Sequence, residues 1–382
     1  MKTTVMNDGS SYRNRIFKNV QRVVIKLGTG VLTNDAGALD TEKICSVAEQ
    51  VSQLWQQGVQ VVLVSSGAVT AGLHGLGLTK RPKERSLIQA AAAIGQGILI
   101  EQYRKFFNQH NRSIAQILLT HSDVKERERH LNSKNTLEAL LQKGVVPVIN
   151  ENDTVAVEEI CFGDNDYLSA LVTHLVHADL LILLSSVDGL INFKKEHIGE
   201  VIDLVPSINS EVMRLVQSHT STWGQGGMQS KLEAARMVTG AGSPVILANG
   251  NHKDVILDLF HGKNLGTLFL AESKRINDRK TWIAFFHRPQ GAVIVDDGAC
   301  VALLEKGKSL LSSGILQVKS DFEKGDVVAI INSQGQEIAR GLTNYSSKEV
   351  LLIHGKRSNE ISLILGVKKV SEVIHRDNLV LI

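Results

Sequence analysis

Cysteine is scarce in this sequence of 382 residues, which contains only three. Cys45, Cys161 and Cys300 lie far apart and form no Cys-x-x-Cys pair. This spacing supports neither a disulfide framework nor a structural zinc site. A reducing compartment fits such cysteine usage, and we therefore expect a cytoplasmic protein.

Long apolar runs are missing as well. The most apolar run, residues 180–184, is far shorter than the roughly 20 residues of a membrane-spanning helix, so no membrane segment is predicted. Residues 1–19 lack the apolar core of a secretory signal and are predicted to form a polar tail. Because these residues include four basic side chains and one acid, an organelle transit peptide is the alternative.

The chain also lacks a large excess of charge. Its 42 Lys and Arg residues against 39 Asp and Glu residues give a formal charge of +3. That excess is too small to mark a nucleic-acid-binding or membrane-surface protein. With 43% hydrophobic and 21% charged residues, the composition excludes a disordered or fibrous chain. At about 150 residues per domain, the length accommodates two globular domains.

Short β-branched runs alternate with longer segments of helical period from residue 20 onward. This alternation is typical of an α/β fold with an open, mainly parallel sheet sandwiched by helices. The predicted strands are residues 20–27, 59–64, 114–119, 145–149, 180–184 and 244–247. The predicted helices are residues 41–57, 86–108, 131–143, 168–174, 210–216 and 228–239. Several strands end in Gly, Ser, Asn or Asp, at the sheet edge where such folds bind ligands.

The pattern changes after about residue 270. Beyond residue 291, short strands recur with turn signals such as Asp297-Gly298 and Gln334-Gly335, which predicts a small, mostly β domain. Residues 291–382 contain eleven basic and eleven acidic residues, and Phe322 and Tyr345 are their only aromatic residues. The predicted organisation is a tail (1–19), an α/β domain (20–272), a linker (273–290), a β domain (291–370) and a C-terminal segment (371–382).

The first predicted strand runs into Lys26-Leu27-Gly28-Thr29-Gly30. An ammonium group beside the backbone N–H groups of a glycine turn suits a phosphate. The chain has no Walker loop, and Thr33 occupies the third glycine position of a dinucleotide fingerprint, so another phosphate-binding device is required. For this segment alone, a solvated lysine after a flexible turn is the alternative.

Ser66 and Gly67 follow the second predicted strand and precede a helical segment. Backbone N–H groups at a helix start attract a carboxylate or a phosphate, which makes these residues a candidate anion site. A local helix cap explains the same residues equally well.

Carboxylates and amides cluster farther along the chain. Asn150-Glu151-Asn152-Asp153 follows the fourth predicted strand, and Gly163-Asp164-Asn165-Asp166 precedes the next helix. Such groups recognise an ammonium group, hold a lysine by charge-assisted hydrogen bonds, or approach a metal. The ligand pattern of an EF-hand loop is missing. A capped turn is the alternative for either segment alone.

A glycine-rich segment, residues 223–231, opens the last predicted helix of the α/β domain. Lys231 is expected in the first helical turn, where the helix dipole is positive and an anion is needed opposite it. Lys26 and Lys231 together suit phosphoryl transfer, which requires positive charge on both sides of the moving group. A solvated lysine after a flexible loop is again the alternative.

With these motifs the chain resembles the amino-acid kinase superfamily, in a branch that carries a C-terminal PUA domain. The resemblance covers nearly everything after Val20 and rests on residues 24–29, 64–68, 147–153, 162–166 and 226–231. It implies an amino-acid kinase fold followed by a PUA domain. It also implies ATP-dependent phosphorylation of the side-chain carboxylate of L-glutamate, which commits glutamate to proline biosynthesis.

The resemblance assigns roles position by position. Lys26 and Lys231 are implied to stabilise the transferred phosphoryl group, and Asp166 is implied to orient them. The residues implied to bind ATP are Lys26, Gly28, Ser185, Ser186, Gln225, Gly226, Gly227, Met228, Gln229, Ser230 and Lys231. The residues implied to bind glutamate are Ser66, Gly67, Asn150, Asp153, Asp164 and Asn165.

The resemblance implies partners as well. Mg²⁺ accompanies ATP, mainly on the phosphates and water, so no dedicated metal site in the protein is predicted. A homo-oligomer is implied. The expected product is an acyl phosphate that water destroys, and a glutamyl-phosphate reductase is therefore the expected downstream partner.

The sequence departs from the family pattern at two places. Ser185-Ser186 stands where the family usually has Thr-Asp, and Gln225 stands where it commonly has Thr. Nucleotide contacts at Ser186 are therefore less firmly implied than those of the two lysines. Asp188 is a candidate for supplying part of the missing charge.

Two other functions compete with glutamate phosphorylation. A sister kinase of the same fold acts on N-acetylglutamate, aspartate, carbamate or a nucleotide, but the acidic Asp153 and Asp164 favour a free α-ammonium over an acetylated one. RNA binding is the alternative of another class, because PUA domains occur in RNA-binding and RNA-modifying proteins. The balanced charge and the two aromatic residues after residue 291 make nucleic acid an unlikely main partner.

Overall fold

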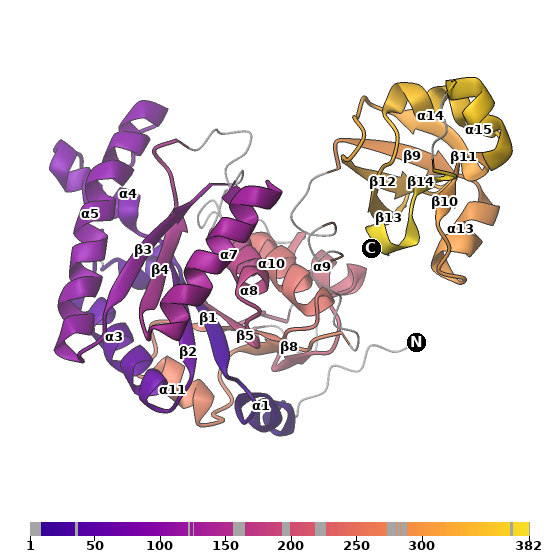
Figure 1. The fold of residues 1–382 in the computed structure, drawn as a ribbon. Coiled ribbons are helices and arrows are strands. Elements are labelled where there is room, and N and C mark those ends of the chain that lie inside the picture. Colours follow the sequence, from indigo (N-terminus) through magenta and orange to yellow (C-terminus); the bar gives the residue numbers. More distant parts are fainter. Residues whose placement is uncertain are drawn as a thin grey trace. The chain divides into compact units, whose positions relative to one another are not determined.

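The computed structural model describes residues 9–34, 37–120, 123–124, 126–155, 165–192, 199–217, 227–272, 280, 283, 289–366 and 370–381. They fall into two compact units, Met1–Arg275 and Ile276–Ile382. Figure 1 labels the elements of both. None of the helices in the described ranges combines the length and the hydropathy that crossing a bilayer requires.

The first unit is built on an eight-stranded sheet in the order β3-β4-β2-β1-β5-β7-β8-β6. All neighbouring strands are parallel except β7 and β8. This confirms the predicted open, mainly parallel sheet. The strands are β1 (Arg22–Leu27), β2 (Gln60–Ser65), β3 (Ile114–Leu119), β4 (Val146–Glu151), β5 (Leu180–Ser185), β6 (Leu204–Val205), β7 (Val245–Asn249) and β8 (Thr267–Phe269).

Helices cover both faces of this sheet, as the sequence predicted. Figure 1 shows α3, α5 and α11 on one face and α7, α8 and α10 on the other. The helices are α1 (Ser10–Phe17), α2 (Thr29–Leu32), α3 (Thr41–Gln56), α4 (Ala68–Leu73), α5 (Arg85–Gln109), α7 (Arg127–Gln142), α8 (Asn165–Leu175), α9 (Ser210–Gln217), α10 (Met228–Gly240) and α11 (Val255–Phe260), with a 3₁₀ turn at His74–Leu76.

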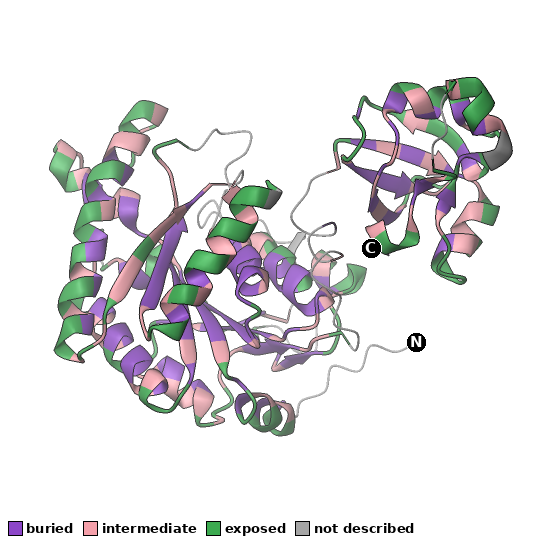
Figure 2. Cartoon of the chain, viewed as in Figure 1, coloured by how far each residue is buried: buried purple, intermediate pink, exposed green. Residues whose placement is uncertain are grey.

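The core of the first unit follows from the alternation of side chains along the strands. Val23, Ile25 and Leu27 of β1 pack with Val47 and Leu54 of α3 in one buried cluster. Successive side chains of a strand point to opposite faces of the sheet, so the residues between them face α8 and α10. Figure 2 shows the strands buried between two helical layers that are exposed on their outer sides.

Helices α4 and α5 approach each other backbone to backbone. A Cβ atom on Gly72 of α4 would lie 1.8 Å from the carbonyl oxygen of Ala91, and one on Gly95 of α5 would lie 1.8 Å from that of Ala68. Real side chains cannot come so close, so glycine is required at both positions. This contact holds α5 against the segment that follows β2.

The prediction of a polar tail is wrong for residues 10–17, which form helix α1. The Arg13 side chain is fully buried; it donates a hydrogen bond to the carbonyl oxygen of Leu265 at 2.9 Å and pairs with Asp203 at 3.0 Å. Phe17 is buried in the same core as β1. Arg13 is one of the basic residues on which the prediction of a polar tail rested, and its buried contacts hold α1 against the first unit.

The second unit contains a five-stranded sheet in the order β11-β9-β12-β13-β15 and a two-stranded sheet of β10 and β14. This confirms the predicted small, mostly β domain. The strands are β9 (Gly291–Val295), β10 (Leu310–Leu311), β11 (Ile315–Lys319), β12 (Val327–Ile331), β13 (Glu337–Leu342), β14 (Glu372–Ile374) and β15 (Leu379–Leu381). The helices are α13 (Asp297–Leu304), α14 (Ser347–Ile353) and α15 (Ser358–Leu365), with 3₁₀ turns at Ser312–Gly314 and Arg376–Asn378.

Two predicted boundaries of the second unit differ from the structure. The separate C-terminal segment, residues 371–382, supplies β14 and β15, which pair with β10 and β13. Ile283, inside the predicted linker, is fully buried against Val327 and Val380. Both segments contribute apolar side chains to the unit, and the burial of those side chains ties them to it.

Candidate active site

Lys26 reaches the site because it lies on the face of β1 opposite Ile25 and Leu27. That face is covered by α8 and α10, and the Lys26 side chain is only 4% exposed. A buried ammonium group loses its hydration and needs a partner of opposite charge. The structure supplies one from α8.

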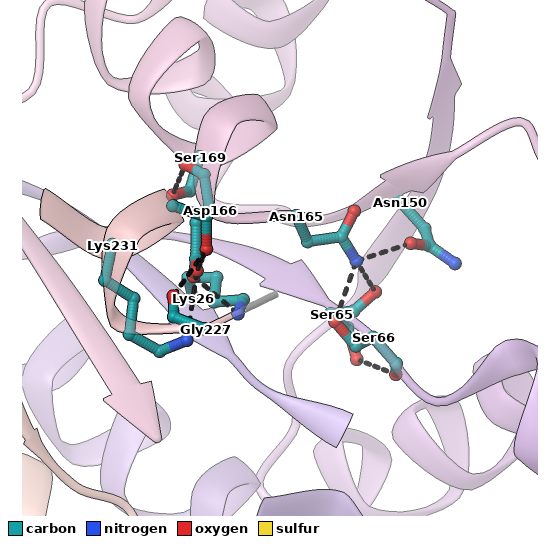
Figure 3. Close-up of polar contacts among 10 residues, drawn as sticks. Lys26, Ser65, Ser66, Asn150, Asn165, Asp166, Ser169, Gly227 and Lys231 are labelled. Carbon is teal, nitrogen blue, oxygen red and sulfur yellow. Dashed lines mark hydrogen bonds and ion pairs between the residues drawn. The ribbon is translucent and has the colours of Figure 1, made fainter. Parts of the chain in front are cut away.

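Asp166 is that partner, and it binds a second lysine as well. It lies in the first turn of α8, and its side chain is fully buried. Lys26 Nζ is 2.6 Å from Oδ1, and Lys231 Nζ is 3.1 Å from Oδ2. Figure 3 shows both ammonium groups converging on this carboxylate. The three residues, which we call the charge triad, carry a net charge of +1 and therefore attract an anion.

Helix α10 adds to this positive site. It begins after Gly227, and the Ser230 hydroxyl lies 2.8 Å from Asp166 Oδ2 and 2.9 Å from the carbonyl oxygen of Gly227. Lys231 follows within the same turn. Since the N-terminal end of a helix carries partial positive charge, the helix and the charge triad favour the same kind of ligand. Within the protein Lys231 pairs with Asp166, and its pairing with an anionic ligand stays a prediction.

The glycine turn after β1 lies beside the triad. A Cβ atom on Gly28 would be 3.7 Å from Lys26 Nζ and 3.2 Å from the Leu184 carbonyl oxygen, and one on Gly30 would be 3.6 Å from Ser186 Oγ. Gly28 also donates its N–H group to that Leu184 oxygen at 3.0 Å. The structure therefore brings Gly28 and the end of β5, with Ser185 and Ser186, to the sheet edge where Lys26 lies.

Asp188, the candidate for the missing charge, contacts neighbours from the end of β7 and from the loop that follows it. Its Oδ1 accepts a hydrogen bond from Asn249 Nδ2 at 2.8 Å and lies 3.4 Å from His252 Nε2. The carboxylate is largely exposed. Its placement near the end of β5 keeps it available to a ligand, but no contact joins it to the charge triad within the described residues.

A second group of polar side chains lies on the other side of α8, and we call it the amide cluster: Ser65, Ser66, Asn150 and Asn165. Asn165 Nδ2 donates to Ser66 Oγ at 2.9 Å, to Asn150 Oδ1 at 2.9 Å and to the carbonyl oxygen of Ser65 at 3.2 Å. Gly67 caps α4 with a φ of 99°, a left-handed conformation that glycine adopts without strain. The ends of β2, β4 and α8 thus meet at one place.

The first turn of α8 joins the two groups. Asn165 and Asp166 are neighbours in sequence, but successive helical residues point about 100° apart, so Asn165 reaches the amide cluster and Asp166 reaches the charge triad. Figure 3 shows the two side chains diverging from the helix start. An anion on the triad and an uncharged or zwitterionic ligand on the cluster would therefore face each other across this turn.

Asp153, which follows β4, differs from the other carboxylates of the site. Burial raises its pKa, and the positive charge of Arg81 opposes this with a smaller lowering. A half-buried carboxylate that makes no close ion pair with the residues the structure describes is costly for the folded protein unless a cation binds there. This supports the predicted role of Asp153 opposite an ammonium group.

The structure brings some of the predicted site residues together and leaves others apart. The charge triad, Gly28, Gly227 and Ser230 come together, and so do Ser66, Gly67, Asn150 and Asn165. Met228 is half-buried, and exposed Gln229 donates to Glu233 at 2.9 Å along α10. Asp164, Gln225 and Gly226 lie outside the described residues.

Sequence reasoning missed one residue of the amide cluster, Ser65, and one residue beside it, Gln96. Ser65 contributes its carbonyl oxygen, and Gln96 of α5 accepts a hydrogen bond from Asn150 Nδ2 at 2.9 Å. Ser65 was adjacent to a predicted residue and could have been included. Gln96 lies inside a plain helical segment, where no local pattern marks it.

Comparisons with known proteins establish the family of the chain. The profile of the Amino acid kinase family matches residues 21–249, and that of the PUA domain matches residues 291–365. A glutamate 5-kinase of Caldanaerobacter subterraneus subsp. tengcongensis is 46% identical over 364 residues, which cover 94% of this chain and 98% of the relative. A glutamate 5-kinase of Trichlorobacter lovleyi is 48% identical over 371 residues, which cover 97% and 99%.

A solved structure supports the fold alone. The carbamate kinase of Giardia lamblia bound to AMP-PNP matches 66% of this chain and 99% of its own length, at 16% identity and a TM-score of 0.50. The near-complete coverage of the relatives and the two matched domains lead to one assignment. The chain belongs to the amino acid kinase family, in its glutamate 5-kinase branch, and carries a C-terminal PUA domain.

Proposed function

We propose that the chain transfers the γ-phosphoryl group of ATP to the side-chain carboxylate of L-glutamate, which yields L-glutamyl 5-phosphate and begins proline biosynthesis. The observation that carries the proposal is the charge triad, in which two ammonium groups from β1 and α10 meet on Asp166 at 2.6 and 3.1 Å. The names of the relatives agree with this reaction.

The charge triad suits the demands of phosphoryl transfer between ATP and a carboxylate. A glutamate side chain has an ordinary pKa of about 4.3, so the attacking group is already ionised at neutral pH and no catalytic base is needed. What remains is alignment and stabilisation of charge on the phosphoryl oxygens. Lys26 and Lys231 supply that charge from two elements, and Asp166 holds both in place.

The amide cluster and Asp153 suit glutamate. The carboxylate of Asp153 pairs with the α-ammonium of a free amino acid, which an acetylated amino acid lacks. Asn165, Asn150 and Ser66 offer hydrogen-bonding groups for the rest of the molecule. Glutamate in this position would direct its side chain toward the triad across the first turn of α8. The residues therefore favour glutamate over N-acetylglutamate.

The residues of the site fit a magnesium ion that is carried by the nucleotide. Asp166, the buried carboxylate of the charge triad, already binds two ammonium groups. Mg²⁺ prefers phosphate oxygens and water to an all-protein site. When bound there, it neutralises part of the charge on the phosphates.

Two partners extend the proposal. An acyl phosphate hydrolyses in water, so a reductase that consumes glutamyl phosphate directly is the expected neighbour in the pathway. Self-association is supported by the apolar side chains that α5 exposes: Leu87, Ile94 and Ile98 are 36%, 38% and 37% exposed.

A cytoplasmic location stays a prediction from the cysteine spacing.

The test measures ATP consumption with L-glutamate, N-acetylglutamate, L-aspartate and no acid, while hydroxylamine traps any acyl phosphate. We expect hydroxamate with L-glutamate only. Lys26→Met and Lys231→Met should each lower kcat by about 100-fold or more, the scale of losing one group that stabilises transition-state charge. Lys263→Met, which changes an exposed lysine on the surface, is the matched control and should keep full activity.

Turnover of another acid in place of glutamate would contradict the substrate but leave the phosphoryl-transfer site standing. Full activity in both Lys26→Met and Lys231→Met would contradict the role of the charge triad itself.

A further inference from the structure

Helix α5 touches the amide cluster through a residue that no predicted motif contains. Gln96 Oε1 accepts a hydrogen bond from Asn150 Nδ2 at 2.9 Å. One residue earlier, Gly95 packs against the backbone of α4, which fixes this part of α5 beside the site. Two turns farther on, Tyr103 hydrogen-bonds Ser65 at 2.9 Å. Helix α5 therefore braces the ends of both β4 and β2.

The direction of these hydrogen bonds is fixed at one end by a backbone group. Asn165 Nδ2 lies 3.2 Å from the carbonyl oxygen of Ser65, and a carbonyl oxygen only accepts. The Asn150 atom 2.9 Å from the same nitrogen must therefore be its oxygen. Asn150 then presents its nitrogen to Gln96, whose facing atom must be an oxygen. Only one orientation of each amide satisfies its neighbours.

The orientation of these amides leaves Asn165 Oδ1 as an acceptor for a ligand. With the two hydrogens of Asn165 Nδ2 shared among three acceptors, its Oδ1 points away from the amide cluster, as Figure 3 shows. A flipped Asn150 would place its nitrogen against the nitrogen of Asn165, and two donors repel each other. The orientation of Asn165 therefore depends on the orientation of Asn150.

We propose that Gln96 is a positioning residue for glutamate binding: its Oε1 locks the amide of Asn150, and through it the amide of Asn165, in the orientation that receives glutamate. This inference rests on the proposed function, since glutamate is the substrate of that reaction. Gln96 is half-buried and acts through Asn150. The ion pairs of the charge triad instead join β1, α8 and α10.

Variants of the full chain test the direction of the bond. Gln96→Met keeps the length of the side chain and removes its acceptor, whereas Gln96→Glu keeps an acceptor for Asn150 Nδ2. We expect Gln96→Met to raise KM for glutamate roughly 10-fold, the effect of a polar group left without its partner, with KM for ATP unchanged. Gln96→Glu should restore most of the binding. Gln109→Met, at the exposed end of α5, is the matched control.

Three results would overturn the assignment while the wild-type chain turns over glutamate. They are an unchanged KM for glutamate in Gln96→Met, an equal rise in both KM values, and a Gln96→Glu variant as impaired as Gln96→Met. The second result would indicate a general structural role. A wild-type chain that does not turn over glutamate would overturn the proposed function first, and this assignment with it.

Discussion

At the scale of single residues, burial raises the pKa of Asp153, and Arg81 offsets only part of that effect. The folded protein therefore holds a proton on Asp153 at pH values where the unfolded chain has released it. Where the native state binds more protons than the unfolded state, the free energy of unfolding falls as the pH rises. Asp153 thus lowers the free energy of unfolding at neutral pH. We infer that this residue serves the binding of glutamate.

Asp153→Asn should therefore separate stability from function. We expect the variant to gain stability over wild type as the pH rises from about 4, near the ordinary pKa of an aspartate, through the raised native pKa, and to keep that gain at pH 7. Its KM for glutamate should rise at the same time, because the ammonium partner is lost. Urea unfolding at pH 4 and pH 7, with glutamate kinetics at pH 7, checks both. An equal stability difference at the two pH values would contradict the raised pKa.

The sequence could predict the charge triad but not its supports. Lys26, Asp166 and Lys231 each lie in a short motif of glycines, amides or acids, and the resemblance of these motifs to a known family implied their grouping. Gln96 becomes important only because α5 packs on α4 and brings its side chain to Asn150 at 2.9 Å. A contact that depends on helix packing leaves no mark in the sequence around it.

At the scale of elements, the contact between α4 and α5 leads to a second prediction. Gly95→Ala would place a Cβ atom 1.8 Å from the Ala68 carbonyl oxygen, so the helices must move apart. We expect a loss of about 1–3 kcal/mol in the free energy of unfolding, as for other overpacked sites, together with a higher KM for glutamate because Gln96 moves with α5.

Gly97→Ala is the matched control on the same helix. A Cβ atom there meets nothing within 4 Å, so alanine should stabilise α5 by about 0.5–1 kcal/mol. Urea unfolding of both variants measures the contrast. A Gly95→Ala protein as stable as the Gly97→Ala protein would contradict the close approach of the two helices.

The predicted elements succeeded where local composition decides the structure. The β-branched run at residues 20–27 became β1, the leucine-rich run at residues 180–184 became β5, and the segment of helical period at residues 41–57 became α3. Strands β6 and β8 have two and three residues and were missed, because such short strands carry no periodic signal. Helix α1 was missed because the burial of Arg13 depends on acceptors far along the chain.

At the scale of the whole molecule, the two units have separate cores. Residues of the first cluster come from within 17–268, and those of the second from within 293–379. All described residues of the charge triad and the amide cluster lie in the first unit. Domains with their own core and site can work alone.

A chain that ends at residue 275 should therefore keep its chemistry. We expect ATP-dependent hydroxamate formation from glutamate with kcat within about threefold of the full chain, since separate domains with their own cores can function independently. Far-UV circular dichroism establishes that the shortened chain is folded. Loss of turnover in a folded fragment would mean that the second unit contributes to the reaction.

Helix α1 also bears on how the protein is made. The acceptors of Arg13 lie on Asp203, Leu265 and Gly266, up to 253 positions farther along the chain. At a synthesis rate of about 5–20 residues per second, the ribosome needs roughly 10–50 s to deliver them. Until Asp203 is made, Arg13 has none of these partners, so α1 is synthesised long before it can dock. During translation, the docking of α1 on the first unit therefore waits for residues near the end of that unit.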